Sequence, residues 1–449
     1  MAKQRIQLSD HFTYSRLLRF VLPCIGTMLF TSIYGIVDGL CVSNFVGKTA
    51  FAAVNLIMPL PMLLGTIGFM LGTGGSAIVG ITLGEGDQKK ADRYFTLFLL
   101  AALVSVSVLA VLGIVFLRPI AVLLGAKGEL LDYAVRYGRI LMVSLPTFAL
   151  QNMFQSFFVT AEKPHLGFWF TVGAGCTNMV LDVLMVGIWG WGVEGAAIAT
   201  FISQLVGGVL PVFYFIDRSN SSRLHLCKTS FYSKVLRDAC INGSSELMTN
   251  LSMSLVNILY NYQLLRLAGE NGVAAYGVIM YAAFLFVAVF VGYAVGSAPI
   301  VSFHYGARNH AEVHNLYRKS LRLIAVVAVT LTLASMFIIP CVARIFVGYD
   351  AELLALTSRA FRLYALSFLI MGFNVYASSF FTALGDGVTS ALISFLRTML
   401  FQVIAIIVLP MLLDIDGIWL AITAAELAAL AVSVTMFITK DKVFHYRKA

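Results

Sequence analysis

Long apolar stretches separated by short polar connections make up most of this chain. Windows long and apolar enough to cross a bilayer as a helix recur twelve times. They predict spans at approximately 17–42, 51–81, 94–117, 137–161, 164–188, 191–216, 236–265, 273–303, 318–346, 362–384, 388–413 and 416–438. Several exceed the roughly 20 residues that a bilayer requires, which predicts tilted or extended helices. The expected fold class is an all-α polytopic membrane protein with 12 transmembrane helices.

The composition excludes a soluble multidomain enzyme. The chain is 59% hydrophobic and 12% charged, whereas soluble domains carry about 25% charged residues. The net charge of +9 is spread over short connections, so we interpret it as a topology signal rather than a nucleic-acid surface. Most basic residues fall at the N-terminus, in the even-numbered connections and at the C-terminus. This distribution predicts a multi-pass protein of the cell (inner or plasma) membrane with both termini in the cytoplasm.

The longest polar connection, residues 217–235, divides the chain near its middle. It is expected to be a cytoplasmic linker between an N-terminal six-helix bundle (1–216) and a C-terminal six-helix bundle (236–449). Because six is an even number, the two halves have the same orientation and form a parallel internal repeat. Transporters commonly bind substrate at the interface between such repeats.

Polar, glycine and Phe-Phe landmarks recur in the two halves at a nearly constant sequence offset. GTGGSAIVGITLGEGDQKKA at 72–91 corresponds to AVGSAPIVSFHYGARNHAEV at 294–313, which aligns Gly84 with Gly306, 222 positions later. A Phe-Phe pair at 157–158 recurs at 380–381, and each pair precedes a short polar turn and a new span. The repeat is therefore predicted from landmarks rather than from residue-by-residue identity.

Two aspartates lie inside the apolar spans of the first half. Asp38 is in the first span and Asp182 in the fifth, each about 18–20 residues from its predicted cytoplasmic start. At 1.5 Å per residue both reach a depth of roughly 27 Å, in the outer part of the membrane. A carboxylate in lipid costs several kcal/mol, so such residues are rarely present without a role.

Neutral polar residues are expected at a similar depth. Asn178 precedes Asp182 by one helical turn and shares its face, Asn152 lies midway along span four and Thr200 in the outer half of span six. Two neighbouring carboxylates in a low dielectric cannot both be ionised at low cost, so they are expected to bind a proton. Alternatively they bind Na⁺, with Asp38 and Asp182 as metal ligands and amide or hydroxyl oxygens completing the shell. The remaining alternative is that the acids make only interhelical hydrogen bonds.

The second half offers a less clear polar set. Glu246 in span seven and Glu426 in span twelve are candidates for binding a cationic substrate or a proton, and either alternatively pairs with Arg397 in span eleven. Asn257 is the positional counterpart of Asp38, and Asn374 in span ten is a candidate neighbour of the same cavity. We therefore expect a substrate-related polar site here, with these residues either functional or structural.

Other site chemistry has no signature in the sequence. It contains no GxxxxGK[ST] motif, no CxxC pair among its six cysteines and no HxxxH pair. No cofactor, nucleotide or nucleic-acid partner is expected, so either the energy for transport comes from an ion gradient or the pore is passive. Flexible Met and aromatic side chains favour a deformable cavity for amphipathic, cationic small molecules.

These landmarks resemble the multidrug and toxic compound extrusion (MATE) family. Besides Asp38, the resemblance is carried by AAVNLIMPLPMLL at 52–64, LGTGGSAIVGITLGEGDQKKA at 71–91, TNMVLDVLMV at 177–186, WGVEGAAIATFIS at 191–203 and GSSELMTNLSMSLVNILYN at 243–261. The resemblance implies two six-helix bundles in a V around a central cavity, and export driven by H⁺ or Na⁺.

The resemblance also implies roles for individual residues. In related members a first-half cation site uses positions that match Asp38, Asn152, Asn178, Asp182 and Thr200. Another branch pairs a Glu in span seven, matched by Glu246, with an Asp in span ten. This chain lacks that Asp, and its nearest polar residue is Asn374, so the first half is the expected cation site.

The sequence therefore predicts a transporter rather than an enzyme: a monomeric antiporter that exports amphipathic organic cations by alternating access, in contact with membrane lipid. The first alternative is a lipid or lipid-linked sugar flippase of the same superfamily, which would hold phosphate with several basic residues in the spans. The second is a membrane-embedded enzyme or a receptor, which would need a nucleophile, metal ligands or a large extramembrane domain.

Overall fold

A computed structural model describes residues 6–46, 48–348 and 350–446, and in these residues the secondary structure is helical, without strands. The first half contains α1 (Tyr14–Phe45), α2 (Lys48–Ile57), α3 (Pro59–Gly84), α4 (Gln88–Leu123), α5 (Glu129–Thr160), α6 (Pro164–Asp182), the π-helical η1 (Val183–Ile188), α7 (Gly192–Gly208) and α8 (Leu210–Ile216). The second half contains α9 (Ser233–Asn242), α10 (Ser244–Gly306), α11 (His310–Val347), α12 (Ala351–Ala365), α13 (Phe368–Ala383), α14 (Gly387–Phe395), the π-helical η2 (Leu396–Leu400), α15 (Phe401–Thr439) and α16 (Asp441–Phe444).

The expected twelve crossings are present. Within the described residues eight helical stretches are long and apolar enough to cross a membrane, and α12 with α13, which meet at a bend of 46°, makes nine. α5 is less apolar but, with 32 residues, long enough for a further crossing, and it packs lengthwise against α3, α4 and α7 of the same bundle. α10 reverses at Gly269 (φ 60°) and α15 at Asp414 (φ 49°), so each of these long helices supplies two crossings.

Helix ends differ from the expected spans in a consistent direction. α5, α11 and α12 begin 8 to 11 residues before the apolar windows at 137, 318 and 362. Their added turns carry charged residues, which a hydropathy window excludes although they continue the helix. The second span is divided at Met58, because Pro59 and Pro61 cannot donate backbone hydrogen bonds to the preceding turn.

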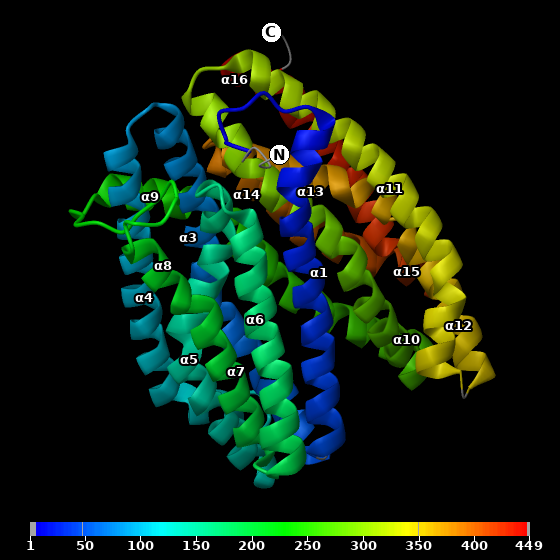
Figure 1. The fold of residues 1–449 in the computed structure, drawn as a ribbon. Coiled ribbons are helices and arrows are strands. Elements are labelled where there is room, and N and C mark those ends of the chain that lie inside the picture. Colours follow the sequence, from blue (N-terminus) through cyan, green and yellow to red (C-terminus); the bar gives the residue numbers. More distant parts are fainter. Residues whose placement is uncertain (1–5, 47, 349, 447–449) are drawn as a thin grey trace.

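The two halves meet at the end of the molecule that carries both termini and diverge toward the opposite end (Figure 1). The main contacts between halves join α10 to α3 and to α1. The result is the two-bundle V expected for this fold, with its open end opposite the termini.

The N-terminal segment crosses between the halves at the closed end. The Leu8 amide donates to Glu162 Oε1 of the first half (2.9 Å), and the Phe12 amide donates to Glu312 Oε1 on α11 (2.8 Å). His11 Nδ1 lies 2.6 Å from the other oxygen of Glu312. Since Leu8 and Phe12 are fully buried, this segment is a packed part of the closure.

Equivalent connections of the two halves carry equivalent ion pairs. Glu162, between α5 and α6, pairs with Arg223 after α8 (2.6 Å). Asp386, between α13 and α14, pairs with Lys440 after α15 (2.8 Å). The internal repeat therefore extends from the helices to the polar contacts at their ends.

Candidate cation site and substrate cavity

The fold brings Asp38 and Asp182 together. Asp38 lies on α1 and Asp182 is the last residue of α6, directly before the π-helical turn η1. Their carboxylates interact electrostatically with each other and with the buried Tyr137 of α5. Asp182 is fully buried, whereas Asp38 is partly exposed.

Several buried polar atoms on α5, α6 and α7 lack hydrogen-bond partners, apart from the contact of Asp182 with the Asp38 carboxyl group. In the described part of the chain this holds for both carboxylate oxygens of Asp182, the amide nitrogens of Asn178 and Asn152, and the amide oxygen of Gln204. Asn178 and Asn152 are 2% and 5% exposed, and Asn178 lies one turn before Asp182 on the same face. Because buried polar groups are nearly always hydrogen-bonded, such atoms indicate places for a proton, an ion or water.

Thr200 lies on a helix that adjoins those of Asn152 and Asp182. It lies on α7, which packs against α5 and α6, and its hydroxyl donates to the Ala196 carbonyl (3.0 Å). The hydroxyl oxygen therefore retains capacity to accept or to coordinate. The candidate ligand groups of the whole set are carboxylates, amides and a hydroxyl. Their oxygen atoms suit a proton or a hard cation. Within the described residues no group of three or more His, Cys, Asp or Glu could hold a metal ion.

In the second half, Glu426 is held by two residues through three hydrogen bonds. Arg397 Nε donates to its Oε1 (2.7 Å), and Asn374 Nδ2 donates to its Oε2 (2.7 Å) and to its backbone oxygen (2.8 Å). Ser433 in turn donates to Asn374 Oδ1 (2.8 Å). Of the alternatives for Glu426, the structure contains the pairing with Arg397, and Asn374 lies fully buried behind that pair.

A cavity of about 510 Å³ lies between the halves and is lined mainly by the second. Glu246, Asn257, Arg397 and Glu426 line it, as do the side chains of Met62 and Met253. The Glu246 carboxylate has no hydrogen bond or ion pair with a described residue. The size of the cavity and its largely apolar wall suit a small organic molecule.

The cation candidates and the cavity occupy different places. Asp38, Asn152, Asn178, Asp182 and Thr200 do not line the cavity as the structure describes it. The structure thus brings Asp38 and Asp182 together in the first half and places Glu246, Asn257 and Glu426 in the wall of the cavity. Coupling between the two places would have to pass through the helices that separate them.

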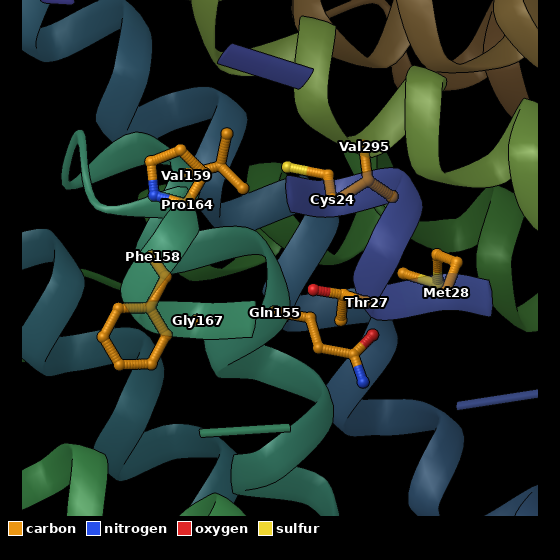
Figure 2. Close-up of a pocket in the computed structure, with 9 residues that line it drawn as sticks. All are labelled: Cys24, Thr27, Met28, Gln155, Phe158, Val159, Pro164, Gly167 and Val295. Carbon is orange, nitrogen blue, oxygen red and sulfur yellow. The ribbon is translucent and has the colours of Figure 1, made fainter. Parts of the chain in front are cut away.

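A second, much smaller pocket lies between α1, α5, α6 and α10 (Figure 2). Its volume is about 10 Å³, which is close to the minimum for one water molecule. Figure 2 shows the lining side chains of Thr27 on α1 and Gln155 on α5 next to each other, with those of Cys24 and Val295 together above them in this view. It is too small for a drug-like substrate.

Hydroxyl residues that no sequence motif marks, Ser378, Thr382 and Ser394, also line the cavity. Ser378 contacts Ser390 (2.8 Å) and Ser394 (2.9 Å), and Thr382 donates to Ser390 (2.7 Å). The available signal was the four-residue spacing of hydroxyl residues in spans ten and eleven, which places them on one face of each helix.

Comparisons with known proteins agree with the fold. The MatE family model matches two stretches, residues 23–184 and 247–408. Multidrug export protein MepA of Staphylococcus saprophyticus is 20% identical over 442 residues, covering 96% of this chain and 95% of that protein. MepA of Staphylococcus aureus is 21% identical over 433 residues, with the same coverage.

Solved structures share the fold. A MATE crystal structure in complex with MaL6 superposes with a TM-score of 0.92 at 22% identity, over 99% of this chain and 100% of that one. A MOP superfamily transporter from Pyrococcus furiosus superposes with a TM-score of 0.89 at 23% identity, over 98% and 99%. Since the family model matches both halves, at ranges that correspond across the internal repeat, the chain belongs to the MatE (multidrug and toxic compound extrusion) family.

Proposed function

We propose that this protein exports drugs or toxic compounds by antiport with H⁺ or Na⁺. The observation that carries the proposal is the pairing of two membrane-span carboxyl groups, Asp38 and Asp182, in a bundle whose helices α5, α6 and α7 also bury polar atoms without hydrogen-bond partners. A permanent structural role would satisfy these atoms with protein partners. The names of the related staphylococcal proteins, multidrug export proteins, supply the direction and breadth of transport.

In the proposed cycle the cation binds at Asp38 and Asp182, with Asn152, Asn178 and Thr200 as neighbouring ligands. Binding changes the hydrogen bonds among α1, α5, α6 and α7 and so shifts the balance between cavity shapes. The ion drives this shift only to the extent that its affinity differs between the two states. The bundles of residues 1–216 and 236–449 rock against each other, and the 217–235 connection joins them.

The direction of the cycle follows from topology. With both termini in the cytoplasm of the cell membrane, as the basic residues favour, the open end of the V faces outward. A cation enters there, substrate leaves, and the inward-facing state releases the cation. One chain contains both bundles and the whole cavity, which supports a monomer as the working unit.

Amphipathic organic cations are the substrates that this cavity favours. Glu246 supplies an acid that faces the cavity without a cationic protein partner, and the apolar wall includes Met62, Met253 and Phe284. Thioethers adapt to varied shapes. A flippase for phosphate-linked lipids is less favoured, because the basic residue that lines the cavity, Arg397, is held by Glu426.

Transport in proteoliposomes tests the proposal. Purified protein is reconstituted, and ethidium movement is followed with a pH gradient or a sodium gradient imposed separately. One of the two gradients should drive ethidium against its own concentration difference. If neither gradient drives it, the antiport proposal is wrong.

A further inference from the structure

We propose that Arg397 forms a subsite that binds a carboxylate of the substrate, so that among amphipathic organic cations the cavity prefers planar aromatic ones that also carry a carboxylate, that is, zwitterions. This inference deepens the proposed function, on which it rests for the cavity being the substrate site. It assigns a ligand-binding role to a guanidinium that otherwise serves only as the counter-ion of Glu426.

The guanidinium of Arg397 is hydrogen-bonded to the described part of the protein at one edge only. Arg397 donates to Glu426 through Nε alone (2.7 Å). Its two terminal amino groups have no acceptor among the described residues, although its side chain is only 13% exposed, and it lines the cavity. An arginine offers five N–H donors in a planar fork that matches a carboxylate. The fork is therefore anchored at one edge and open to the cavity at the other.

The backbone at Arg397 also departs from a regular α-helix. Arg397 lies in η2, a π-helical turn between α14 and α15. Such turns are rare and are found frequently at functional sites. In the first half the corresponding span contains η1, which directly follows Asp182. Each half thus places a π-helical turn at a charged residue inside a membrane span.

The cavity wall near Arg397 contains flat tyrosine rings. Tyr260 and Tyr276 stack with ring centres 4.9 Å apart and planes at 14°. Both line the cavity together with Tyr364, which interacts electrostatically with Arg397 and Glu426. Flat aromatic surfaces next to a guanidinium suit a flat aromatic ligand that carries a carboxylate.

The charges in the cavity wall favour a zwitterion over a simple anion. The charged residues in the described cavity wall are Glu246, Arg397 and Glu426, so with all three ionised the wall carries one net negative charge. A simple anion is therefore repelled, because Glu426 already neutralises Arg397. A zwitterion satisfies both ends, with its ammonium group near Glu246 and its carboxylate on the open edge of Arg397.

Equilibrium binding of two matched dyes tests this inference without any gradient. The probes are rhodamine 110, which has a free carboxylate, and its methyl ester rhodamine 123, with full-length protein in lipid nanodiscs at pH 7 and fluorescence anisotropy as the readout. In R397Q/E426Q, which replaces the ion pair with two amides, rhodamine 110 should bind more weakly by on the order of tenfold, as expected for losing a charge-assisted hydrogen bond. Rhodamine 123 should change by less than about twofold.

Two further variants complete the design. R397K keeps a positive charge for Glu426 but lacks the open edge of the guanidinium, so it should also weaken rhodamine 110 selectively, even if the double variant folds poorly. E246Q should weaken both dyes. Equal weakening of both dyes in R397K and R397Q/E426Q, or no weakening of rhodamine 110, overturns the inference, as does a wild-type protein that binds neither dye. If the dye selectivity appears but no gradient drives transport, the proposed antiport fails and the subsite stands.

Discussion

Gly84 at the end of α3 and Gly306 at the end of α10 pack against each other's helix as a symmetric pair. A Cβ on Gly84 would lie under 3.0 Å from the Phe303 carbonyl oxygen, and one on Gly306 under 3.0 Å from the Ile81 carbonyl oxygen. Phe303 follows Ile81 by the same 222 positions that separate the glycines. This crossing is therefore a local two-fold axis of the internal repeat, at the closed end of the V.

Alanine at either glycine should weaken the closed end. Because the Cβ would meet backbone atoms, Gly84→Ala or Gly306→Ala should cost about 1–3 kcal/mol of stability, measured as a lower melting temperature in detergent. Gly277→Ala is the matched control, since it also lies in α10 and a Cβ there meets nothing within 4 Å. Equal melting temperatures for the Gly306 and Gly277 variants would contradict the proposed contact.

Neutralising Asp38 or Asp182 should abolish gradient-driven transport, and neutralising Asp182 should not lower the stability of the protein. Asp182→Asn removes a buried carboxylate that has no cationic partner among the described residues and that faces a second carboxylate, Asp38, so the variant should melt at a higher temperature than the parent protein. Asp38→Asn and Asp182→Asn should both reduce gradient-driven ethidium transport to the rate seen without a gradient. Asp132→Asn, at an exposed position on α5, should change neither property. Full gradient-driven transport by Asp38→Asn would remove Asp38 from the mechanism.

The buried pair of Arg397 and Glu426 should behave as a unit. Arg397→Gln leaves Glu426, whose side chain is 4% exposed, as a buried charge with neutral partners, and should cost about 3–5 kcal/mol. The double variant Arg397→Gln with Glu426→Gln should be more stable than Arg397→Gln alone, which thermal unfolding of both in the same detergent would measure. Additive losses would argue against a coupled pair.

The ion pair between Asp386 and Lys440 should make stability depend on pH. Burial opposes ionisation of Asp386, but hydrogen bonds from Lys440 and Thr389 outweigh it and hold the pKa of this carboxyl below its usual range. A depressed pKa in the folded state means that the contribution is present at neutral pH and is lost as the pH falls through that pKa.

Asp386→Asn keeps the helix cap and removes the charge. It should cost about 1–3 kcal/mol at pH 7, and the difference from the parent protein should shrink on acidification below about pH 4. Glu194→Gln is the control, since Glu194 lies 3.7 Å from Arg136 with both side chains largely exposed and should have little effect. Melting temperatures across a pH series test both, and a pH-independent difference for Asp386→Asn would contradict the assignment.

The N-terminal segment should contribute to closure through Phe12. This ring is fully buried and packs edge-on against Phe20 and His304, so Phe12→Ala should cost about 3–5 kcal/mol. Phe231→Ala, at a position 76% exposed, should be nearly neutral in the same melting assay. A small loss for Phe12→Ala would show that residues 6–13 lie on the closed end without supporting it.

The sequence predicted most of the helical architecture because its signals are local. Apolar windows located the crossings, and the gaps between predicted spans seven and eight and between eleven and twelve fall where Gly269 and Asp414 reverse the chain. The helix ends were less accurate, because polar turns that extend a helix look like connections. The one-turn spacing of Asn178 and Asp182 correctly placed both on one buried face.

Which side chains meet across helices required the tertiary structure. Glu246 and Glu426 both looked like acids of one cavity, but the fold gives Glu426 the partners Arg397 and Asn374 and leaves Glu246 facing the cavity. The tilt and rotation of each helix decide such pairings, and these are set by bends, π-helical turns and close glycine contacts that involve distant parts of the chain. Hydropathy and helical period determined that this is a twelve-span, two-fold repeated membrane protein with acids in its spans. Only packing determined which acids lack a partner, because burial and pairing depend on every neighbouring helix at once.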